Sequence, residues 1–340
     1  MTEIARTQPS DTKLVICVHH PFTFWNPPPE MAERVRRRWP GMCVVHLPTY
    51  DRLADELTDT DIFVGYSLLA EQFITARKLK WIHVTAAAVA HLMYPGIRSS
   101  GIVMTNASGI HSIPMAEHII GTFVALARRF PDCVRYQMQS DWCQQRLWDA
   151  PPELRPTELR GKVALFIGFG AVGSEAGRLA RAIGMRVWAA TRSGRDDQQI
   201  AEHVLPASAL HEALPQPDFV VVAAPETPET TNMMGEREFS LMKPSAYFIN
   251  VARGALVDEP ALIRALEKHA IAGAALDVTA EEPLPSESPL WGLENAFITP
   301  HSSAISDRLW ERQTDLLMEN LERWFSDRQL LNRVDLVRGY

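Results

Sequence analysis

Three polar side chains that could do acid–base chemistry each follow a different apolar run in the C-terminal half of the chain. Arg253 follows AYFINVA, Glu282 follows ALDVTAE and His301 follows FITP. An arginine binds a carboxylate through two parallel hydrogen bonds, and a histidine gives or takes a proton near neutral pH. A carboxylate beside that histidine favours its charged form and fixes its orientation. Together the three groups suit the reduction of a carbonyl next to a carboxylate, provided that a hydride donor lies beside them.

Each of the three residues has an ordinary alternative when it is considered alone. Arg253 could form a surface or domain-bridging ion pair, Glu282 could be a solvated carboxylate, and His301 could be a helix cap or a core group. Their common position after predicted strands favours a shared site, because open α/β sheets bind ligands outside the carboxyl ends of their strands. We therefore predict that the three side chains meet in one crevice.

The segment 162–181, KVALFIGFGAVGSEAGRLAR, predicts where the hydride donor binds. An apolar run of strand composition is followed by Gly168, Gly170 and Gly173 in the spacing G-x-G-x-x-G, and then by apolar residues at helical spacing. In this arrangement the first glycine permits a tight turn, the second lets the backbone approach a pyrophosphate, and the third lets the helix pack close to the strand. The strand–turn–helix context predicts a dinucleotide site, which the glycine spacing alone would not.

The residues after the next predicted strand favour NADP over NAD as the cofactor. An acidic residue at that strand end binds the ribose 2′-hydroxyl of NAD, whereas an arginine accommodates the 2′-phosphate of NADP. Thr191 occupies the acidic position, and Arg192, Ser193 and Arg195 follow it. The alternative is that the two arginines are plain surface charges.

Apolar runs that alternate with helical segments predict two doubly wound parallel sheets. Strands are expected at 14–19, 42–47, 61–66, 81–85 and 102–106 of the first sheet, and six more at 163–167, 185–191, 218–224, 246–251, 273–278 and 296–299. Helices are expected at 30–39, 69–78, 114–129, 174–183, 259–269 and 307–325, with an irregular arm at 141–156. The last helix is expected to return to the first domain. The prediction is a flavodoxin-like substrate domain of residues 1–112 and 307–340, and an inserted Rossmann dinucleotide-binding domain of residues 113–306.

Composition narrows the class of protein. A chain of 340 residues, 46% hydrophobic and 22% charged, is typical of a globular protein with two domains. We find no apolar run long enough to span a membrane and no secretory signal, and the four cysteines form neither C-x-x-C nor a metal-ligand cluster. The expectation is a cytoplasmic protein without a bound metal. The net charge of −7 argues against a nucleic-acid partner.

Several long segments resemble the D-isomer-specific 2-hydroxyacid dehydrogenase family. They include GKVALFIGFGAVGSEAGRLARAIGMRV, APETPETTNMM, MKPSAYFINVARGALVDEPALIRAL, GAALDVTAEEPLPSESPLW and NAFITPHSSA. The resemblance covers nearly the whole chain and is weakest before residue 80. It implies an NAD(P)-dependent oxidoreductase that interconverts a 2-oxo acid and a D-2-hydroxy acid, with Arg253, Glu282 and His301 as its catalytic set. It also implies that Asp277 meets the nicotinamide carboxamide. It implies further that Ala171, Val172, Val251 and Thr230 lie along the cofactor. With the glycines and the strand-end residues above, the residues expected to line the cofactor are Gly168, Gly170, Ala171, Val172, Gly173, Thr191, Arg192, Ser193, Ala224, Pro225, Thr230 and Val251.

One loop departs from the family pattern. The family usually has a glycine after the strand that here ends near Thr85, where backbone amides receive the substrate carboxylate, and Ala88 stands at that position. If the position needs a positive φ, alanine costs about 1 kcal/mol or shifts the loop. We expect Ala87, Ala88 and Val89 to line the substrate end, with Tyr66 and Trp291 shaping the pocket. The alternatives are that the loop is only a helix start and that the two aromatic residues belong to the core.

The resemblance also bears on assembly and on alternative functions. Members of this type commonly pair through the helix that is here 114–129, which implies a homodimer, and Trp142 on the following arm could reach a neighbouring subunit. The alternative function is a cofactor-sensing binding protein of the C-terminal-binding-protein corepressor type, which would bind the cofactor without turning over 2-oxo acids. A formate-specific relative is disfavoured, because its catalytic pairing uses glutamine where this chain has Glu282. Glyoxylate, hydroxypyruvate and bulkier 2-oxo acids all remain open as substrates.

Overall fold

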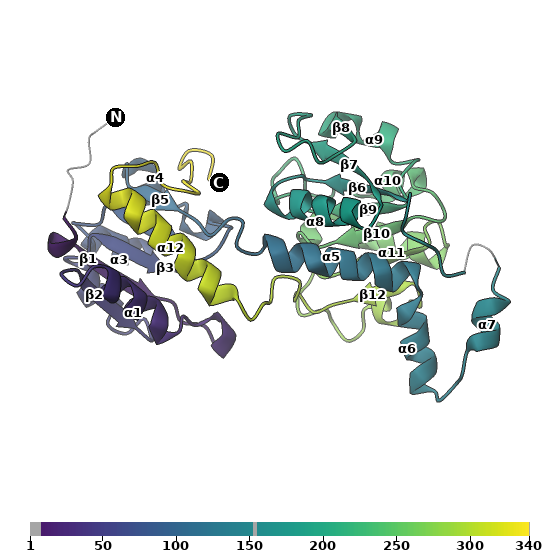
Figure 1. Cartoon of the computed structure of the whole chain (residues 1–340), viewed down its shortest axis with the longest axis horizontal. Coiled ribbons are helices and arrows are strands. Elements are labelled where there is room, and N and C mark those ends of the chain that lie inside the picture. Colours follow the sequence, from purple (N-terminus) through teal and green to yellow (C-terminus); the bar gives the residue numbers. More distant parts are fainter. Residues whose placement is uncertain (1–7, 152–154, 340) are drawn as a thin grey trace. The chain divides into compact units, whose positions relative to one another are not determined.

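The computed structural model describes residues 8–151 and 155–339. The chain divides into two compact units, one made of residues up to Ile110 together with those from Ser306 onward, and one of His111–Ile305 (Figure 1). These bounds differ by one or two residues from the division expected from the sequence. Each unit is built on its own parallel sheet.

The first unit contains a five-stranded parallel sheet in the order β2-β1-β3-β4-β5, which is the flavodoxin-like order. All four residues of β3 and of β4 are buried, as expected for strands covered on both faces. The strands are β1 (Lys13–Cys17), β2 (Cys43–Leu47), β3 (Ile62–Gly65), β4 (Trp81–Val84) and β5 (Val103–Thr105). The helices before the crossover are α1 (Pro29–Arg38), α2 (Leu53–Leu57), α3 (Ala70–Thr75) and α4 (Pro95–Ser99).

The C-terminal helix α12 (Leu309–Phe325) belongs to the first unit, as the sequence predicted. Leu317 and Leu321 are fully buried one helical turn apart, and they join α1 in a core that includes Val35. Near the end of α12, the Trp324 ring stacks on Trp81 of β4 with 5.5 Å between the ring centroids. Figure 1 shows α12 lying across this sheet.

The second unit contains seven parallel strands in the order β12-β11-β10-β9-β6-β7-β8, which extends the dinucleotide-binding order by one strand. The strands are β6 (Val163–Ile167), β7 (Arg186–Thr191), β8 (His203–Pro206), β9 (Phe219–Val222), β10 (Tyr247–Asn250), β11 (Gly273–Leu276) and β12 (Ala296–Ile298). The expected number of six strands was therefore wrong, since β8 was missed. This edge strand ends in Pro206 and buries only Leu205, so it lacks an apolar run, and an edge is where a sheet tolerates proline.

Two helices lie side by side on one face of the second sheet, α5 (Ser112–Ala127) and α8 (Ala171–Ala182) (Figure 1). Their shared core contains Phe123 and Phe166, with ring centroids 6.4 Å apart. Three further helices lie between the strands of this unit, α9 (Leu210–Ala213), α10 (Glu236–Leu241) and α11 (Glu259–Glu267). The side chain of Asp258 caps α11 by accepting a hydrogen bond from the amide of Ala261.

The segment 141–156, expected as an irregular arm, is partly helical, and a further helix that was not expected precedes it. After α5 the chain forms α6 (Phe130–Met138) and the short α7 (Gln144–Trp148), which Figure 1 shows leading away from the end of α5. Residues 152–154 of the expected arm lie outside the described residues. Within the described part of the chain, no helix is both long and apolar enough to cross a membrane.

Candidate active site

The ends of three neighbouring strands place the predicted catalytic residues at one edge of the second sheet. The register pairs Asn250 of β10 with Leu276 of β11, and Leu276 with Ile298 of β12. The three strands therefore end level with one another, and Arg253 and His301 each follow such an end by three residues. Because all the strands are parallel, their loops emerge on the same side, which is the ligand-binding side of such sheets.

His301 and Glu282 are in direct contact. The Nδ1 atom of His301 lies 2.6 Å from Oε2 of Glu282, and the other carboxylate oxygen accepts a hydrogen bond from the amide of Thr279 at 3.2 Å. Both side chains remain partly open to solvent, with 47% of His301 and 37% of Glu282 exposed. This pairing leaves Nε2 of His301 without a partner among the described residues, so that nitrogen can meet a substrate oxygen.

Asp277 fixes the backbone that carries His301. Its main-chain oxygen accepts a hydrogen bond from the amide of His301 at 2.8 Å, and its Oδ1 accepts from the Thr299 hydroxyl at 2.6 Å and from the amide of Ser302 at 2.9 Å. Its Oδ2 accepts from the amide of Ser303 at 3.0 Å. His301 takes the left-handed conformation here, with a φ of 50°. The Asp277 carboxylate thus holds the loop in the shape that presents the imidazole.

The ionisation of Asp277 fits this role. Burial alone would raise the pKa of this carboxyl, but hydrogen bonds from the side chains of Ser303 and Thr299 and from the amides of Ser302 and Ser303 lower the pKa overall. The charged carboxylate is therefore the form that holds the loop. The sequence-based expectation for Asp277 was a contact with the nicotinamide carboxamide, and the structure adds these bonds to the protein's own backbone.

Arg253 is positioned by a buried amide. The side chain of Asn250, which is 1% exposed, donates a hydrogen bond to the main-chain oxygen of Arg253 at 2.9 Å and accepts one from the amide of Ala252 at 3.0 Å. The Arg253 guanidinium is exposed and donates to the main-chain oxygen of Ala252 at 2.6 Å. Within the described residues it forms no ion pair with an acidic side chain, so its charge is available to an anion.

Gly254 brings the Arg253 loop against the Glu282 loop. A Cβ atom added at Gly254 would lie 1.9 Å from the main-chain oxygen of Thr279 and 2.6 Å from the amide nitrogen of Ala280. Only glycine permits this approach, because a methyl group would overlap the neighbouring backbone. The amide of Ala280 also donates to the Glu259 carboxylate at 2.8 Å, which ties this loop to the start of α11.

The glycine-rich turn after β6 fits a dinucleotide. Gly168 has a φ of +92°, and a Cβ there would lie 2.5 Å from the amide nitrogen of Ala224, at the point where the strand order reverses between β6 and β9. A Cβ at Gly173 would lie 2.3 Å from the oxygen of Gly168, whereas one at Gly170 would meet nothing within 4 Å. Gly170 precedes α8, and no side chain of the described residues caps that helix, so the first amides of α8 are suited to receive a pyrophosphate.

The other predicted cofactor residues lie at the ends of β7 and β9. The Thr191 hydroxyl accepts from the amide of Arg195 at 3.0 Å and closes the turn that carries Arg192 and Ser193, both of which are exposed. The Thr230 hydroxyl donates to the main-chain oxygen of Pro225 at 2.8 Å, which closes the loop after β9. The expected residues Ala171 and Val172 open α8, and Val251 follows β10 directly.

The predicted substrate residues lie in the first unit, after β3 and β4. Ala88 does not have a positive φ, so the strain considered for alanine at this position is absent. Ala87 and Ala88 are exposed and Val89 is buried, and the amides of Ala88 and Val89 donate no hydrogen bond within the described residues. The Tyr66 ring stacks on His91 with 4.5 Å between the centroids, and the His91 imidazole also contacts the main-chain oxygen of Tyr66.

The two aromatic residues considered for the pocket are not core residues. Tyr66 is 47% exposed and Trp291, in the second unit, is 56% exposed. The Trp291 indole donates to the main-chain oxygen of Pro285 at 2.9 Å, which keeps its ring over the 285–291 segment.

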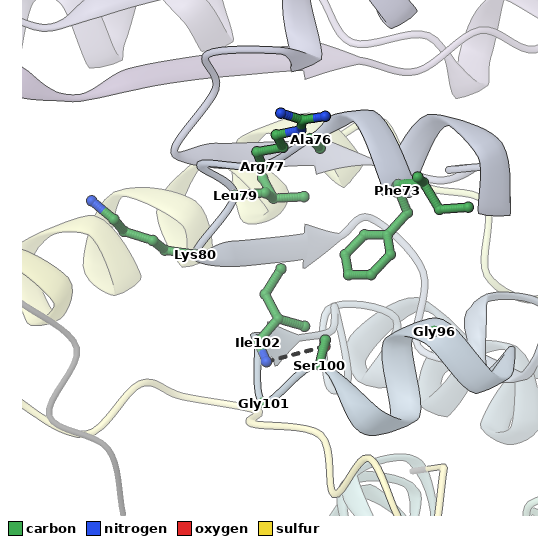
Figure 2. Close-up of a pocket in the computed structure, with 10 residues that line it drawn as sticks. Phe73, Ala76, Arg77, Leu79, Lys80, Gly96, Ser100, Gly101 and Ile102 are labelled. Carbon is green, nitrogen blue, oxygen red and sulfur yellow. Dashed lines mark hydrogen bonds between the residues drawn. The ribbon is translucent and has the colours of Figure 1, made fainter.

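A separate hollow in the first unit lies away from the predicted substrate residues. It has a volume of about 450 Å³ and is lined by residues such as Phe73, Leu79 and Ile102, with Lys80 at its edge (Figure 2). Lys80 precedes β4 and Ile102 precedes β5, so the hollow lies at the amino ends of these strands. Tyr66 and Ala88 follow carboxyl ends, which places them at the opposite edge of the same sheet.

The sequence analysis did not identify three residues that position the site, namely Asn250, Gly254 and Ser303. Asn250 ends an otherwise apolar strand, and a polar residue at the end of a buried run is a signal that could have identified it. Gly254 and Ser303 gave no such signal, because their importance comes from contacts with segments distant in the sequence.

Comparison with known proteins identifies the family of the chain. Residues 120–303 match the family described as D-isomer specific 2-hydroxyacid dehydrogenase, NAD binding domain. The chain is 31% identical over 278 residues to a glyoxylate reductase of Pyrococcus furiosus, an alignment that covers 80% of this chain and 81% of that protein. Two solved structures named as members of the same family are each 27% identical and superpose with a TM-score of 0.78. One, from Aeromonas salmonicida, covers 96% of this chain and 99% of its own, and the other, from Xanthobacter autotrophicus in complex with NADPH and MES, covers 97% and 100%. The chain therefore belongs to the D-isomer specific 2-hydroxyacid dehydrogenase family and is an NAD(P)-dependent oxidoreductase.

Proposed function

We propose that this protein is an NADPH-dependent reductase of small 2-oxo acids, which it converts to D-2-hydroxy acids. The observation that carries the proposal is the contact between His301 and Glu282 beside the arginine loop at the carboxyl end of the sheet. An imidazole with one nitrogen held by a carboxylate and the other unpaired is equipped to give a proton to a carbonyl oxygen. A nearby arginine that forms no ion pair among the residues the structure describes is equipped to hold the carboxylate of the same substrate.

Each of these side chains has a distinct role in the proposed reaction. Arg253 binds the substrate carboxylate and orients the adjacent carbonyl. His301 holds a proton at Nε2 and gives it to the carbonyl oxygen, while Glu282 keeps Nδ1 engaged and stabilises the imidazolium. The nicotinamide group, when it is bound, supplies the hydride that reaches the carbonyl carbon. The reaction then balances as 2-oxo acid, NADPH and a proton giving 2-hydroxy acid and NADP⁺.

The choice of NADPH rests on the end of β7. Thr191 replaces the carboxylate that would repel a 2′-phosphate, and its hydroxyl shapes the turn that carries Arg192 and Ser193. In the loop after β9, hydrogen bonds from the amide of Glu229 and from the Thr227 side chain lower the pKa of the Glu229 carboxyl, and the positive charge of Arg192 adds to this shift. The Xanthobacter relative solved with NADPH agrees with this preference.

The substrate loop supports a small anionic substrate. The amides of Ala88 and Val89 donate no hydrogen bond within the described residues and can receive an anion, and alanine at position 88 adds only a methyl group to that surface. A glyoxylate reductase among the relatives agrees with a small 2-oxo acid.

The proposal is tested with a panel of 2-oxo acids that includes glyoxylate, hydroxypyruvate and bulkier acids, assayed with NADPH and with NADH by the loss of reduced-nicotinamide absorbance. We expect turnover that is faster with NADPH. Arg253→Ala should raise KM and lower kcat, because this variant loses the cation that holds the carboxylate. Arg98→Ala serves as a matched control, since Arg98 is an arginine of the first unit whose side chain binds the C-terminal backbone. Tight NADPH binding without turnover of any acid would instead indicate a cofactor-sensing binding protein.

We also infer a homodimer, located in the cytoplasm. The outer surface of α6 supports an assembly, because Phe130, Val134 and Met138 recur every four residues and are each at least half exposed. The buried face of α5 is already used against α8, so a partner would contact its other face and α6. Light scattering on the purified protein tests the dimer, and a monomer at all concentrations would contradict it.

A further inference from the structure

A buried glutamine interrupts the apolar stripe of α12. Four side chains at intervals of four residues form this stripe, and none of them is more than 2% exposed, namely Leu309, Gln313, Leu317 and Leu321. The side-chain nitrogen of Gln313 donates to the main-chain oxygen of Thr85 at 2.6 Å, whereas its side-chain oxygen is buried without a hydrogen-bond partner among the described residues. Leucine would fit the stripe at a lower cost, because a buried amide loses its hydrogen bonds to water. The bond to Thr85 is therefore the interaction that this glutamine adds to the first unit.

A second buried amide holds the same loop. Asn106 follows β5, is 8% exposed, and donates from its side-chain nitrogen to the main-chain oxygen of Ala87 at 2.8 Å. Its side-chain oxygen accepts from the amide of Ser108 at 3.1 Å, and its own amide donates to the main-chain oxygen of Asn332 at 3.0 Å. Asn106 is thus fixed by its own neighbours and can hold Ala87 in one place.

Both side chains act on residues 85–89, which follow β4 and are here called the substrate loop. Between their two contacts, the amide of Ala107 donates to the main-chain oxygen of Ala86 at 3.0 Å. Three consecutive carbonyl groups of the loop, those of residues 85, 86 and 87, therefore accept hydrogen bonds from the rest of the first unit.

The held carbonyl group of Ala87 fixes the direction of the next amide. The Ala87 oxygen and the Ala88 N–H group belong to one planar peptide unit, and in a trans peptide these two bonds point in opposite directions. The bond from Asn106 to this oxygen therefore turns the Ala88 N–H group away from Asn106. Ala88 is exposed, and its N–H group donates no hydrogen bond within the described residues. We propose that Asn106 and Gln313 are positioning residues, which hold the substrate loop so that the Ala88 amide meets the substrate carboxylate.

This inference rests on the proposed function, in which the loop receives an anion. An amide N–H group attracts a carboxylate, whereas the oxygen of a carbonyl group repels it. If the peptide between Ala87 and Ala88 turned over, its oxygen would face the substrate instead. The bonds from Asn106 and Gln313 oppose that reversal, so these residues set the affinity for the carboxylate without touching the substrate.

The expected effect is on KM rather than on kcat. The carboxylate is charged in the ground state and in the transition state alike, so loss of the amide contact weakens the binding of both. Hydrogen bonds to charged groups are strong enough that the loss of one weakens binding roughly 10-fold. We expect KM for glyoxylate to rise by about this factor in a variant that lacks the Asn106 donor, and kcat to change little.

Two variants remove the donors with little change in side-chain size. Asn106→Asp keeps the oxygen that bonds to Ser108 and replaces the donor to Ala87 by an acceptor. Gln313→Met removes the bond to Thr85 together with the unpartnered oxygen, and so tests the loop without a buried charge. Gln313→Met should also raise KM, by a smaller factor because Thr85 lies at the start of the loop.

Two control variants make similar changes away from the loop. Asn320→Asp alters a fully buried amide of α12 that bonds to the backbone of Leu331. Thr314→Val removes a buried hydroxyl that bonds within α12 to the main-chain oxygen of Trp310. Both controls should keep the KM of the unaltered protein. Thermal unfolding shows which variants are folded, and the Kd for NADPH should be the same in all of them, because the predicted cofactor residues belong to the second unit.

Crystal structures of the unaltered protein and of Asn106→Asp separate this inference from the proposed function. We expect the peptide between Ala87 and Ala88 to turn in the variant. If the unaltered protein reduced no 2-oxo acid, the proposed function would fail, and the direction of this peptide would still decide the role of Asn106. If Asn106→Asp did not fold, the KM and the crystal structure of Gln313→Met would decide in its place. An unchanged peptide, an unchanged KM in the folded variants, or an equal rise of KM in the controls would overturn the proposal.

Discussion

Replacement of Gly254 by alanine tests whether the contact between the two active-site loops sets the catalytic geometry. The added methyl group would lie 1.9 Å from the main-chain oxygen of Thr279, whereas ordinary contact begins at about 3.4 Å. The two loops must therefore separate by about 1.5 Å. Arg253 is next to Gly254, and Glu282 lies three residues beyond Thr279, so the separation moves the arginine away from the carboxylate–histidine pair.

The expected cost follows from this displacement. A misplacement of about 1 Å in a positioned catalytic group can lower the rate roughly 100-fold, equivalent to about 2.7 kcal/mol of activation free energy. We expect Gly254→Ala to lower kcat/KM for glyoxylate with NADPH by about this factor. The assay is steady-state loss of reduced-nicotinamide absorbance, with the Kd for NADPH measured separately by fluorescence.

A matched glycine separates the contact from general effects of the substitution. A Cβ at Gly292 would meet nothing within 4 Å, so Gly292→Ala should retain the kinetics of the unaltered protein. Thermal unfolding of both variants shows whether any loss comes from an unfolded fraction. If folded Gly254→Ala kept the original kcat/KM, the loop contact would have no part in positioning Arg253 and the reasoning would be refuted.

Three further outcomes are expected. His301→Asn should lower kcat by about 10²–10⁴ through loss of the proton donor, and an unchanged pH–rate profile would place the donor elsewhere. Arg192→Ala should weaken binding of NADPH more than of NADH, and equal losses for the two would contradict a phosphate contact. Burial lowers the pKa of the His83 imidazole from 6.5 to about 4. Between these pH values the imidazole is protonated in the unfolded chain but neutral in the folded chain. The free energy of unfolding should consequently fall by about 3 kcal/mol as pH drops from 6.5 to 4. In denaturant titrations, His83→Gln should reduce this dependence of the unfolding free energy on pH. The same pH dependence in the variant would argue against His83 as the cause.

The elements with long apolar runs were predictable because burial on both faces of a parallel sheet leaves a continuous signal. The strand Val163–Ile167 was expected at its observed bounds, and the final helix was expected in the unit that it completes. The edge strand β8 was missed because Leu205 is its single buried residue, so the strand has neither an alternating nor a continuous apolar pattern. The helix α6 was not expected as a separate element. Its apolar residues Phe130, Val134 and Met138 are exposed and none of its residues is buried, so its sequence lacks the apolar pattern of a helix packed on a core.

In the candidate site, too, some residues could be found from the sequence and others could not. His301 and Glu282 were found together because each follows an apolar strand, and neighbouring parallel strands deliver their loops to one edge. The contacts that hold these residues could not be predicted from local sequence. Ser303 and Gly254 act through atoms of Asp277 and Thr279, and no periodicity links such distant partners. The strain considered at Ala88 likewise depended on the φ angle of that residue, which the local sequence does not determine.

The candidate site separates the groups that hold the loops in shape from those that we propose to react. Asp277 and Asn250 are almost fully buried, and their side chains form hydrogen bonds with the backbone of the loops. These hydrogen bonds therefore stabilise the folded loops. His301 and Glu282 are partly exposed and bond mainly to each other, which leaves Nε2 of His301 open to a ligand. A buried frame of this kind keeps the reacting atoms in register before the substrate arrives, and that preorganisation lowers the activation barrier.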